Sequence, residues 1–239
     1  SDPTAETALR EAIRTSPMVR ADLHVALGDR LAARGHSAEA RAQFETAANA
    51  RTFSAGTRNS KGMALLRLGR MAEAESVWRE LIRDHPDYGR AWLNMASLSI
   101  QRGEWAEVER LARVAIEREP NSAAAWNNLA IGLEELGRAG EAEAAYRRAS
   151  EVDSSDWRAL FNLGILLRKS ARYDEAAEVQ REVLGRNPAH GGAHFELGIL
   201  VAGPLNDPDR ATVQLQAAIG ADPRHPRARQ ARAVLDRLP

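Results

Sequence analysis

The sequence predicts an all-α protein assembled from repeated pairs of helices. Its 239 residues include 33 Lys plus Arg and 33 Asp plus Glu, whereas aromatic residues make up only 5%. This composition favours helices, because strands prefer the β-branched and aromatic side chains that are scarce here. Small residues also recur every 34 positions along the chain. A fixed period of this length is typical of a protein built from stacked repeats.

Two columns of small residues carry the 34-residue period. The first column is Gly28, Gly62, Ala96, Ala130, Gly164 and Gly198, and the second is Ala40, Ala74, Val108, Ala142 and Ala176. Between the columns, a turn is marked by Gly35, Gly69, Gly103 and Gly137. A small residue at a fixed place indicates that two helix backbones approach each other closely there.

The period divides the chain into six repeats, and each repeat is predicted to contain two helices. The repeats are 21–54, 55–88, 89–122, 123–156, 157–190 and 191–225, the last with one extra residue in its turn. Apolar residues spaced three and four apart predict both helices. In the fourth repeat these residues are Trp126, Leu129 and Leu133, followed by Ala142, Tyr146 and Ala149.

Both ends of the chain fit the same scheme. Residues 1–20 are predicted to hold the second helix of a preceding repeat that lacks its first helix, with Asp2 as N-cap and Pro3 in the first turn. Residues 226–239 are predicted to form a capping helix, whose arginines keep the end of the stack soluble. The missing first helix suggests that the chain belongs to a longer protein.

This pattern resembles the tetratricopeptide repeat. The family motif has an aromatic residue at position 4, Leu at 7, a small residue at 8, a bulky residue at 11, Ala at 20, an aromatic residue at 24, Ala at 27 and Pro at 32. Repeat 123–156 matches it at every one of these positions except the last, which is Ser154. The resemblance implies a right-handed α–α superhelix of antiparallel helix pairs, in which positions 2, 5, 6, 9, 12 and 13 of each repeat face a concave groove.

The junction at residues 52–61 departs from the motif. Arg58 and Lys61 occupy positions 4 and 7, where the family has apolar residues, and the preceding segment mixes Thr, Ser and Gly. We therefore expect this junction to be the most irregular in the stack. Gln180 replaces the aromatic residue at position 24, which is a milder departure.

Composition argues against several classes of function. A formal net charge of zero gives no general attraction to nucleic acid or to an anionic membrane. The absence of Cys excludes thiolate catalysis and Cys-ligated zinc. No apolar run approaches the roughly 18 residues of a membrane span, and no signal-peptide pattern is present. The compartment stays open, with a slight preference for the cytoplasm.

No catalytic motif is present, so we expect a protein that is not an enzyme and needs no cofactor or metal. The sequence lacks a phosphate-binding loop, an HExxH helix and a nucleophile elbow. His190 and His194 have the spacing of a metal-binding pair, but we interpret them as a turn residue and a packing residue, because two ligands make a weak site. Glu134 and Glu135 diverge by about 100° on a helix, so we expect a solvated face.

The candidate binding residues occupy groove positions that the resemblance implies. Position 6 is Asn in three successive repeats, and an amide can pair with both the N–H and the C=O of an extended peptide. The alternative is that these amides hydrogen-bond between helices. We expect the amide of Asn128 to face water in the free protein. The predicted groove residues are Asn94, Asn127, Asn128, Asn162, Arg90, Leu93, Ile131, Arg158, Phe161, Ile165, Phe195 and Ile199.

The sequence therefore predicts a protein–protein interaction scaffold that binds a peptide or helix of a partner protein in its concave groove. The family's clamp for a C-terminal carboxylate is absent, because its Lys and Asn positions hold other residues. One alternative is a substrate-recruitment or dimerisation segment of a larger bacterial enzyme, such as a glycosyltransferase or a hydrolase. Another is self-association through the exposed ends of the solenoid.

Overall fold

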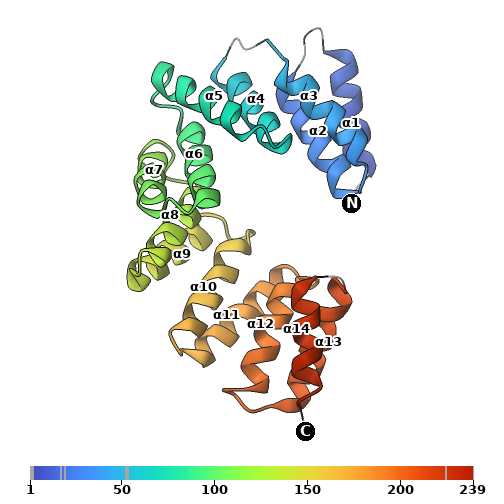
Figure 1. The fold of residues 1–239 in the computed structure, drawn as a ribbon, viewed down its shortest axis with the longest axis vertical. Helices are drawn as coiled ribbons and strands as arrows, with labels where there is room; N and C mark the ends of the chain where they lie inside the picture. The colour runs from blue at the N-terminus through green and yellow to red at the C-terminus, as the bar shows by residue number, and fades with distance from the viewer. Residues whose placement is uncertain (1–2, 17, 19, 52–53, 224, 239) are drawn as a thin grey trace. The chain divides into compact units, whose positions relative to one another are not determined.

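The fold is all-α, as predicted. A computed structural model of the chain describes residues 3–16, 18, 20–51, 54–223 and 225–238, and within them it contains fourteen α-helices and no strand (Figure 1). The helices fall into two compact bodies. The N-terminal body comprises Ser1–Gly103 and Arg110–Pro120, and the C-terminal body comprises Glu104–Glu109 and Asn121–Pro239.

The N-terminal body is built from antiparallel helix pairs. Its helices are α1 (Pro3–Thr15), α2 (Ala21–Ala33), α3 (Ser37–Ala48), α4 (Ala55–Arg67), α5 (Met71–Asp84) and α6 (Gly89–Arg102). Helix α2 packs on α3, and α4 packs on α5. The fully buried side chains of Leu31, Leu65, Trp78 and Leu81 form the core of these pairs. Helix α7 (Trp105–Arg118) is divided between the two bodies.

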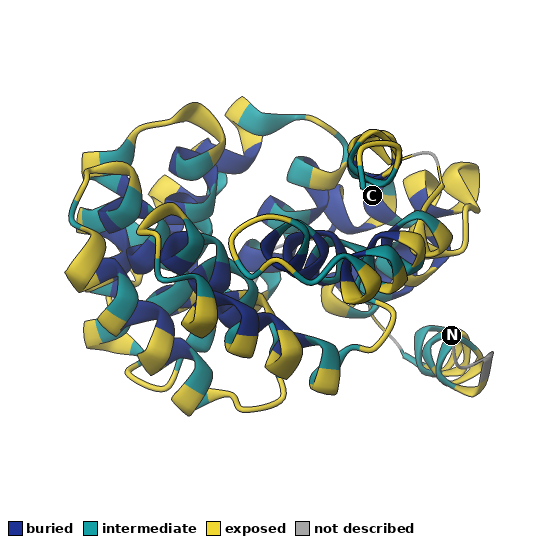
Figure 2. Ribbon diagram, turned by 90° about the horizontal axis from the view of Figure 1, so that it is seen from below, coloured by how far each residue is buried: buried dark blue, intermediate teal, exposed yellow. Residues whose placement is uncertain are grey.

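The C-terminal body continues the same arrangement. Its further helices are α8 (Ala123–Glu135), α9 (Ala139–Val152), α10 (Arg158–Lys169), α11 (Tyr173–Arg186), α12 (Gly191–Ala202), α13 (Pro208–Ala221) and α14 (Pro226–Leu235). Helices α8 and α9, α10 and α11, and α12 and α13 pack as pairs. Buried residues lie where helices meet, and exposed residues lie at turns and outward faces (Figure 2). Below, the even-numbered helices from α2 to α12 are called first helices, and the odd-numbered helices from α3 to α13 are called second helices.

The paired helices cross where the first column of small residues lies. A Cβ atom added to Gly62 would lie 2.5 Å from Nε1 of Trp78, and one added to Gly28 would lie 2.5 Å from Cε1 of Phe44. Trp78 occupies position 24 of the same repeat as Gly62 and is fully buried. The large residue at position 24 therefore packs directly against the bare backbone at position 8.

The turns between paired helices share one left-handed residue. Gly35, Gly69, Gly103 and Gly137 have φ values of 71° to 81°. After Gly137, the N–H of Arg138 bonds to the C=O of Leu133 at 2.9 Å, which closes the helix with a Schellman motif. The next left-handed residues are Ala171, 34 residues later, and Asn206, 35 residues after that, in the turn with the extra residue.

The predicted irregular junction at residues 52–61 lies only partly within the described residues, because 52 and 53 are outside them. For 55–61 the expectation is wrong, since these residues form the first two turns of α4. The Ser54 side chain caps the helix by accepting from the N–H of Thr57 at 3.2 Å. Arg58, at a position that is apolar in the motif, pairs with Asp84 at 2.6 Å. An ion pair thus replaces apolar packing here.

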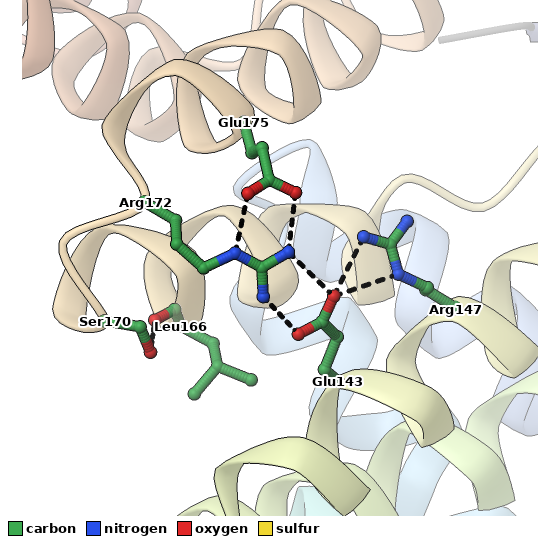
Figure 3. Close-up of polar contacts among 6 residues, drawn as sticks. All are labelled: Glu143, Arg147, Leu166, Ser170, Arg172 and Glu175. Carbon is green, nitrogen blue, oxygen red and sulfur yellow. Dashed lines mark hydrogen bonds and ion pairs between the residues drawn. The ribbon is translucent and has the colours of Figure 1, made fainter.

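Ion pairs also link consecutive second helices. Arg172 donates to Glu175 in its own helix, with Nε and Oε1 2.6 Å apart, and to Glu143 in α9, with Nη1 and Oε2 2.5 Å apart (Figure 3). Glu143 also accepts from Nη2 of Arg147 at 2.9 Å. The hydrogen bond from Arg172 is the main cause that lowers the pKa of the Glu143 carboxyl, and partial burial opposes this effect.

The crossing predicts that Gly62→Ala destabilises the protein. The new methyl group would displace a fully buried indole ring, and we expect the free energy of unfolding to fall by about 1–3 kcal/mol. The control is Gly185→Ala in α11, where an added Cβ meets nothing within 4 Å. There the better helix propensity of Ala is expected to raise stability by about 0.5–1 kcal/mol. Chemical denaturation measures both, and equal effects would contradict the crossing.

The left-handed turns predict that Ala171→Gly stabilises the protein. A side chain in the left-handed region costs roughly 1–2 kcal/mol, and the greater freedom of unfolded Gly offsets part of this gain. We expect a net increase of about 0.5–1 kcal/mol in the free energy of unfolding. The reciprocal variant Gly137→Ala is expected to lose a similar amount, although its added Cβ would clash with nothing. A loss in both variants would show that Ala171 is not strained.

Candidate peptide-binding site

A hollow of about 570 Å³ opens among the first helices of the N-terminal body. Positions 2, 5, 6 and 9 of the first two repeats all line it, together with position 2 of the third. These residues are Asp22, Val25, Ala26 and Asp29, then Gly56, Asn59, Ser60 and Met63, then Arg90. They stand at positions that the resemblance assigns to a groove. The hollow is therefore formed by the faces of α2 and α4, with Arg90 at the start of α6.

Two acidic side chains at this hollow have ion-pair partners, whereas one arginine has none. Asp22 pairs with Arg20 at 2.8 Å, and Asp29 pairs with Arg67 at 2.7 Å. The backbone N–H of Arg90 donates to Oε1 of Glu119 at 3.1 Å. Among the residues that the structure describes, however, the Arg90 guanidinium has no hydrogen-bond or ion-pair partner, and the residue is exposed. An unpaired positive charge thus borders the hollow.

The position-6 asparagines are joined to the preceding repeat. Nδ2 of Asn94 donates to Oδ1 of Asn59 at 2.7 Å, and Nδ2 of Asn162 donates to Oδ1 of Asn127 at 3.1 Å. Both bonds connect consecutive first helices, so the alternative of hydrogen bonding between helices applies to these amides. An amide has two donors and one acceptor oxygen, so a single bond leaves further polar capacity on Asn127 and Asn162. Both of these residues are half-buried.

Asn128 differs from this pattern. It is only 8% exposed, so the expectation that its amide faces water is wrong. Buried amides are retained where they are hydrogen-bonded, and the role of Asn128 in binding stays a prediction. Asn59, which the sequence-based list of site residues omits, is buried to a similar extent at 6%. Asn59 stands at position 5, as Asn127 does, but it lies in the junction that we expected to be irregular.

Two predicted groove residues are covered by α14. Phe195 is 8% exposed and packs in a cluster with Leu215, Ala218 and Ala231, and Ile199 packs against this cluster. Ala231 belongs to α14, which lies beside both α12 and α13. In the structure these two side chains therefore contribute to the core. The prediction had placed them on an open face because it treated the last first helix like the others.

The remaining predicted residues lie at the surface or partly buried. Leu93 in the N-terminal body is half-buried, as are Ile131 and Ile165 in the C-terminal body. Arg158 is exposed, and its Nη1 atom lies 2.6 Å from Oδ2 of Asp156.

Phe161 belongs to an aromatic cluster with His190 and Trp157. The His190 ring lies 4.1 Å from the Trp157 ring and 4.7 Å from the Phe161 ring, measured between centroids. The guanidinium of Arg227, at the start of α14, lies 5.3 Å from the Phe161 centroid. Burial is the main cause that lowers the pKa of His190, and the charge of Arg227 adds to it. A neutral imidazole thus packs edge to face against the ring of Phe161, at an interplanar angle of 73°.

The polar residues considered for chemistry have local partners. Nδ1 of His194 lies 2.7 Å from Oε1 of Gln214 and Nε2 lies 2.8 Å from the C=O of Pro188, while Nδ1 of His190 accepts from a backbone N–H at 3.0 Å. In the described part of the chain, no three His, Asp or Glu residues are grouped to hold a metal ion.

Glu134 does not lie on a solvated face, so that expectation is wrong. Its side chain is 14% exposed, and it accepts from the hydroxyl of Tyr146 at 3.0 Å and pairs with Lys169 at 2.7 Å. Burial and the nearby Glu134 charge raise the pKa of Tyr146, which therefore acts as a hydrogen-bond donor. Glu135 is exposed, as expected.

Among the described helices, none is long and apolar enough to cross a bilayer.

The chain belongs to the tetratricopeptide repeat family. One tetratricopeptide repeat model matches residues 25–77, 128–191 and 161–203, and a second matches residues 65–131. The resemblance inferred from the sequence is thereby confirmed. The division into six repeats with the boundaries given above stays a prediction. No curated protein matches the chain.

Solved structures show the same fold. YrrB, described as a TPR protein with an unusual peptide-binding site, is 19% identical with a TM-score of 0.52, over 95% of this chain and 99% of that one. A chain of the APC/C hetero-tetramer Cut9–Hcn1 is 15% identical with a TM-score of 0.78, over 97% of this chain and 46% of that one. The thermophilic TPR protein TTC0263 from Thermus thermophilus is 15% identical with a TM-score of 0.63, over 76% of this chain and 99% of that one.

The hydrogen bond between the side-chain amides of Asn127 in α8 and Asn162 in α10 predicts energetic coupling between these two residues. We expect a double-mutant cycle with Asn127→Ala, Asn162→Ala and the double variant to give a coupling energy of about 0.5–1.5 kcal/mol, because either single change removes the same hydrogen bond. Urea unfolding followed by circular dichroism measures the three changes. Additive effects would show that the two amides act independently, as exposed groove residues would.

Proposed function

We propose that the chain is a non-enzymatic interaction scaffold that binds an extended or helical segment of a partner protein through its first helices. The observation that carries this proposal is the hollow in the N-terminal body, because all of positions 2, 5, 6 and 9 in two successive repeats line it. Recognition by a row of helices fits a partner that is a continuous segment, which can contact successive first helices in turn.

The chemistry of the lining residues supports a peptide ligand. Met63 offers apolar contact, whereas Thr57 offers a hydroxyl group that can donate or accept, and both side chains are half-buried. Met is flexible and polarisable, so it adapts to different apolar side chains. Arg90 adds one unpaired cation, and a carboxylate on the bound segment would satisfy it. A peptide with an acidic residue near an apolar one is the ligand that these groups fit.

In the C-terminal body, the amide pair of Asn127 and Asn162 supports the same mode of recognition. Their mutual bond fixes the orientation of both side chains, which lowers the entropy that a ligand must remove on binding. The polar capacity left on the pair can reach the backbone of a peptide. In this proposal the amide pair has two roles, since it joins the first helices α8 and α10 and presents oriented amides.

The similar structures support an interaction role by analogy. YrrB is described as having a peptide-binding site, and the Cut9–Hcn1 structure is a hetero-tetramer. At 19% and 15% identity they share the fold, and neither identifies the partner of this chain. The residues of the hollow therefore provide the specific basis for the proposal.

The test begins with a selection of peptides on the intact chain. A displayed library of random twelve-residue peptides is selected, and the affinity of the best binders is measured by fluorescence anisotropy. We expect acidic residues among them, and we expect Arg90→Ala to raise their Kd by about fivefold, the value of one partly exposed ion pair near 1 kcal/mol.

The matched control is Arg30→Ala. Arg30 is an exposed arginine on α2, has no ion pair among the described residues and does not line the hollow. Its replacement is expected to leave Kd unchanged. If no peptide is selected, or if the two variants weaken binding equally, the hollow is not the binding site.

A further inference from the structure

A repeated acidic residue on the second helices links each of three repeats to the next one. Position 21 is Glu in three successive repeats, and each of these residues pairs with an arginine of the next repeat. The pairs are Glu75 with Arg102, Glu109 with Arg138, and Glu143 with Arg172. Glu75 and Glu143 each pair with two arginines, and for Glu143 these are Arg172 and Arg147 (Figure 3). Glu143 therefore contacts both arginines at this junction, and Glu175 also pairs with Arg172.

The next junction, between α11 and α13, has lost this carboxylate. Counting the extra residue in the last turn, the equivalents of Glu143, Arg147, Arg172 and Glu175 are Ala177, Arg181, Asp207 and Arg210. Where the earlier turn has Arg172 followed by Glu175, this turn has the acid first and the arginine second. Asp207 lies 3.3 Å from Arg210. Position 21 is Ala177, which carries no charge. The arginine at position 25 is retained without the acid that accompanies it one repeat earlier.

Arg181 is consequently unpaired. Within the described residues its guanidinium has neither a hydrogen-bond nor an ion-pair partner, and the residue is exposed. Arg147, at the same repeat position, bonds to Glu143 at 2.9 Å. The side chain of Arg210 is 75% exposed, and Asp207 is its single ion-pair partner among the described residues. Two cations therefore face solvent near a place where the preceding repeats have an acid.

A hollow of about 490 Å³ lies between these two arginines. Leu197 and Val201 of α12 form its floor and are 5% and 4% exposed. Leu184 of α11 and Gln214 of α13 complete the lining, so the hollow is bounded by three helices. Next to Gln214, Val213 is 61% exposed, which is unusual for an apolar residue in this chain. The hollow thus combines an apolar floor with a cationic rim.

We propose that this α11–α13 hollow binds a segment of a partner protein in which an apolar side chain adjoins an acidic one. The apolar side chain rests on Leu197 and Val201, and the carboxylate pairs with Arg181 and Arg210. The partner would supply the acid that Glu143 supplies within the chain one repeat earlier. This site lies between the second helices α11 and α13 over a floor from α12, and it shares no lining residue with the hollow in the N-terminal body, so it does not depend on the proposed function.

Both chemical features of the segment are needed. An exposed ion pair alone contributes little, because water and salt screen it. An apolar contact alone would not distinguish this junction from others, whereas the unpaired Arg181, together with the exposed Arg210, selects a negative charge. Arginine suits this role, since its planar guanidinium holds a carboxylate through two parallel hydrogen bonds.

The test is an NMR titration of the ¹⁵N-labelled intact chain with three blocked peptides. Each peptide has two central leucines, flanked by glutamates, by glutamines or by lysines. We expect the glutamate peptide to shift backbone amides in 181–184, 197–201 and 210–214, and to bind at least about fivefold more tightly than the glutamine peptide. The lysine peptide is expected not to bind. The complex with the glutamate peptide should weaken as salt increases.

Variants then assign the charge. Arg181→Ala and Arg210→Ala are each expected to weaken binding of the glutamate peptide about fivefold. Arg147→Ala, which removes the arginine at the same repeat position but one repeat earlier, is expected to leave Kd unchanged. Circular dichroism checks that all three variants remain folded. The proposal is overturned if the glutamate peptide does not bind, if the glutamine peptide binds equally well, if the shifts lie elsewhere, or if Arg181→Ala and Arg147→Ala have the same effect.

Discussion

Every helix pair in this chain depends on how closely its two backbones can approach. Where position 8 is glycine, its bare Cα receives a large side chain of the second helix, as Gly62 receives Trp78 and Gly28 receives Phe44. Dispersion and burial at this contact favour the pair over two separate helices, because a short isolated helix is barely stable in water. Once the crossing is fixed, the first helices present positions 2, 5, 6 and 9 together. The hollow in the N-terminal body is a consequence of that geometry.

This constraint explains which features the sequence could predict. Steric requirements recur in every repeat, so they leave a periodic trace: small residues at the crossing and a left-handed residue in each turn, including Ala171 and Asn206 where no glycine marks it. The fold class followed from these traces. Polar side chains are different, since an amide or a carboxylate satisfies its hydrogen bonds with whichever group lies within reach. Their partners depend on distances that periodicity does not contain.

The predicted site residues illustrate that limit. The pattern correctly placed the asparagines along the first helices, but it did not show that Asn162 bonds to Asn127 or that Asn128 is buried. Phe195 and Ile199 were assigned from repeat position alone, and α14 covers them because they belong to the last first helix. Glu134, which was expected to face solvent, accepts a hydrogen bond from Tyr146 and pairs with Lys169. Each error concerns a side chain whose surroundings depend on a neighbouring element.

A repeat protein also provides its own comparison, because each junction can be judged against the others. The acid at position 21 recurs with an arginine partner in three junctions, and this recurrence makes its replacement by Ala177 informative. On a chain without repeats, Arg181 would be one exposed arginine among many, and exposure alone is ordinary. Here the same position one repeat earlier shows an arginine satisfied by a carboxylate. The difference between the two junctions identifies the missing chemical group as an acid, and the apolar floor beside it indicates what kind of segment would carry that acid.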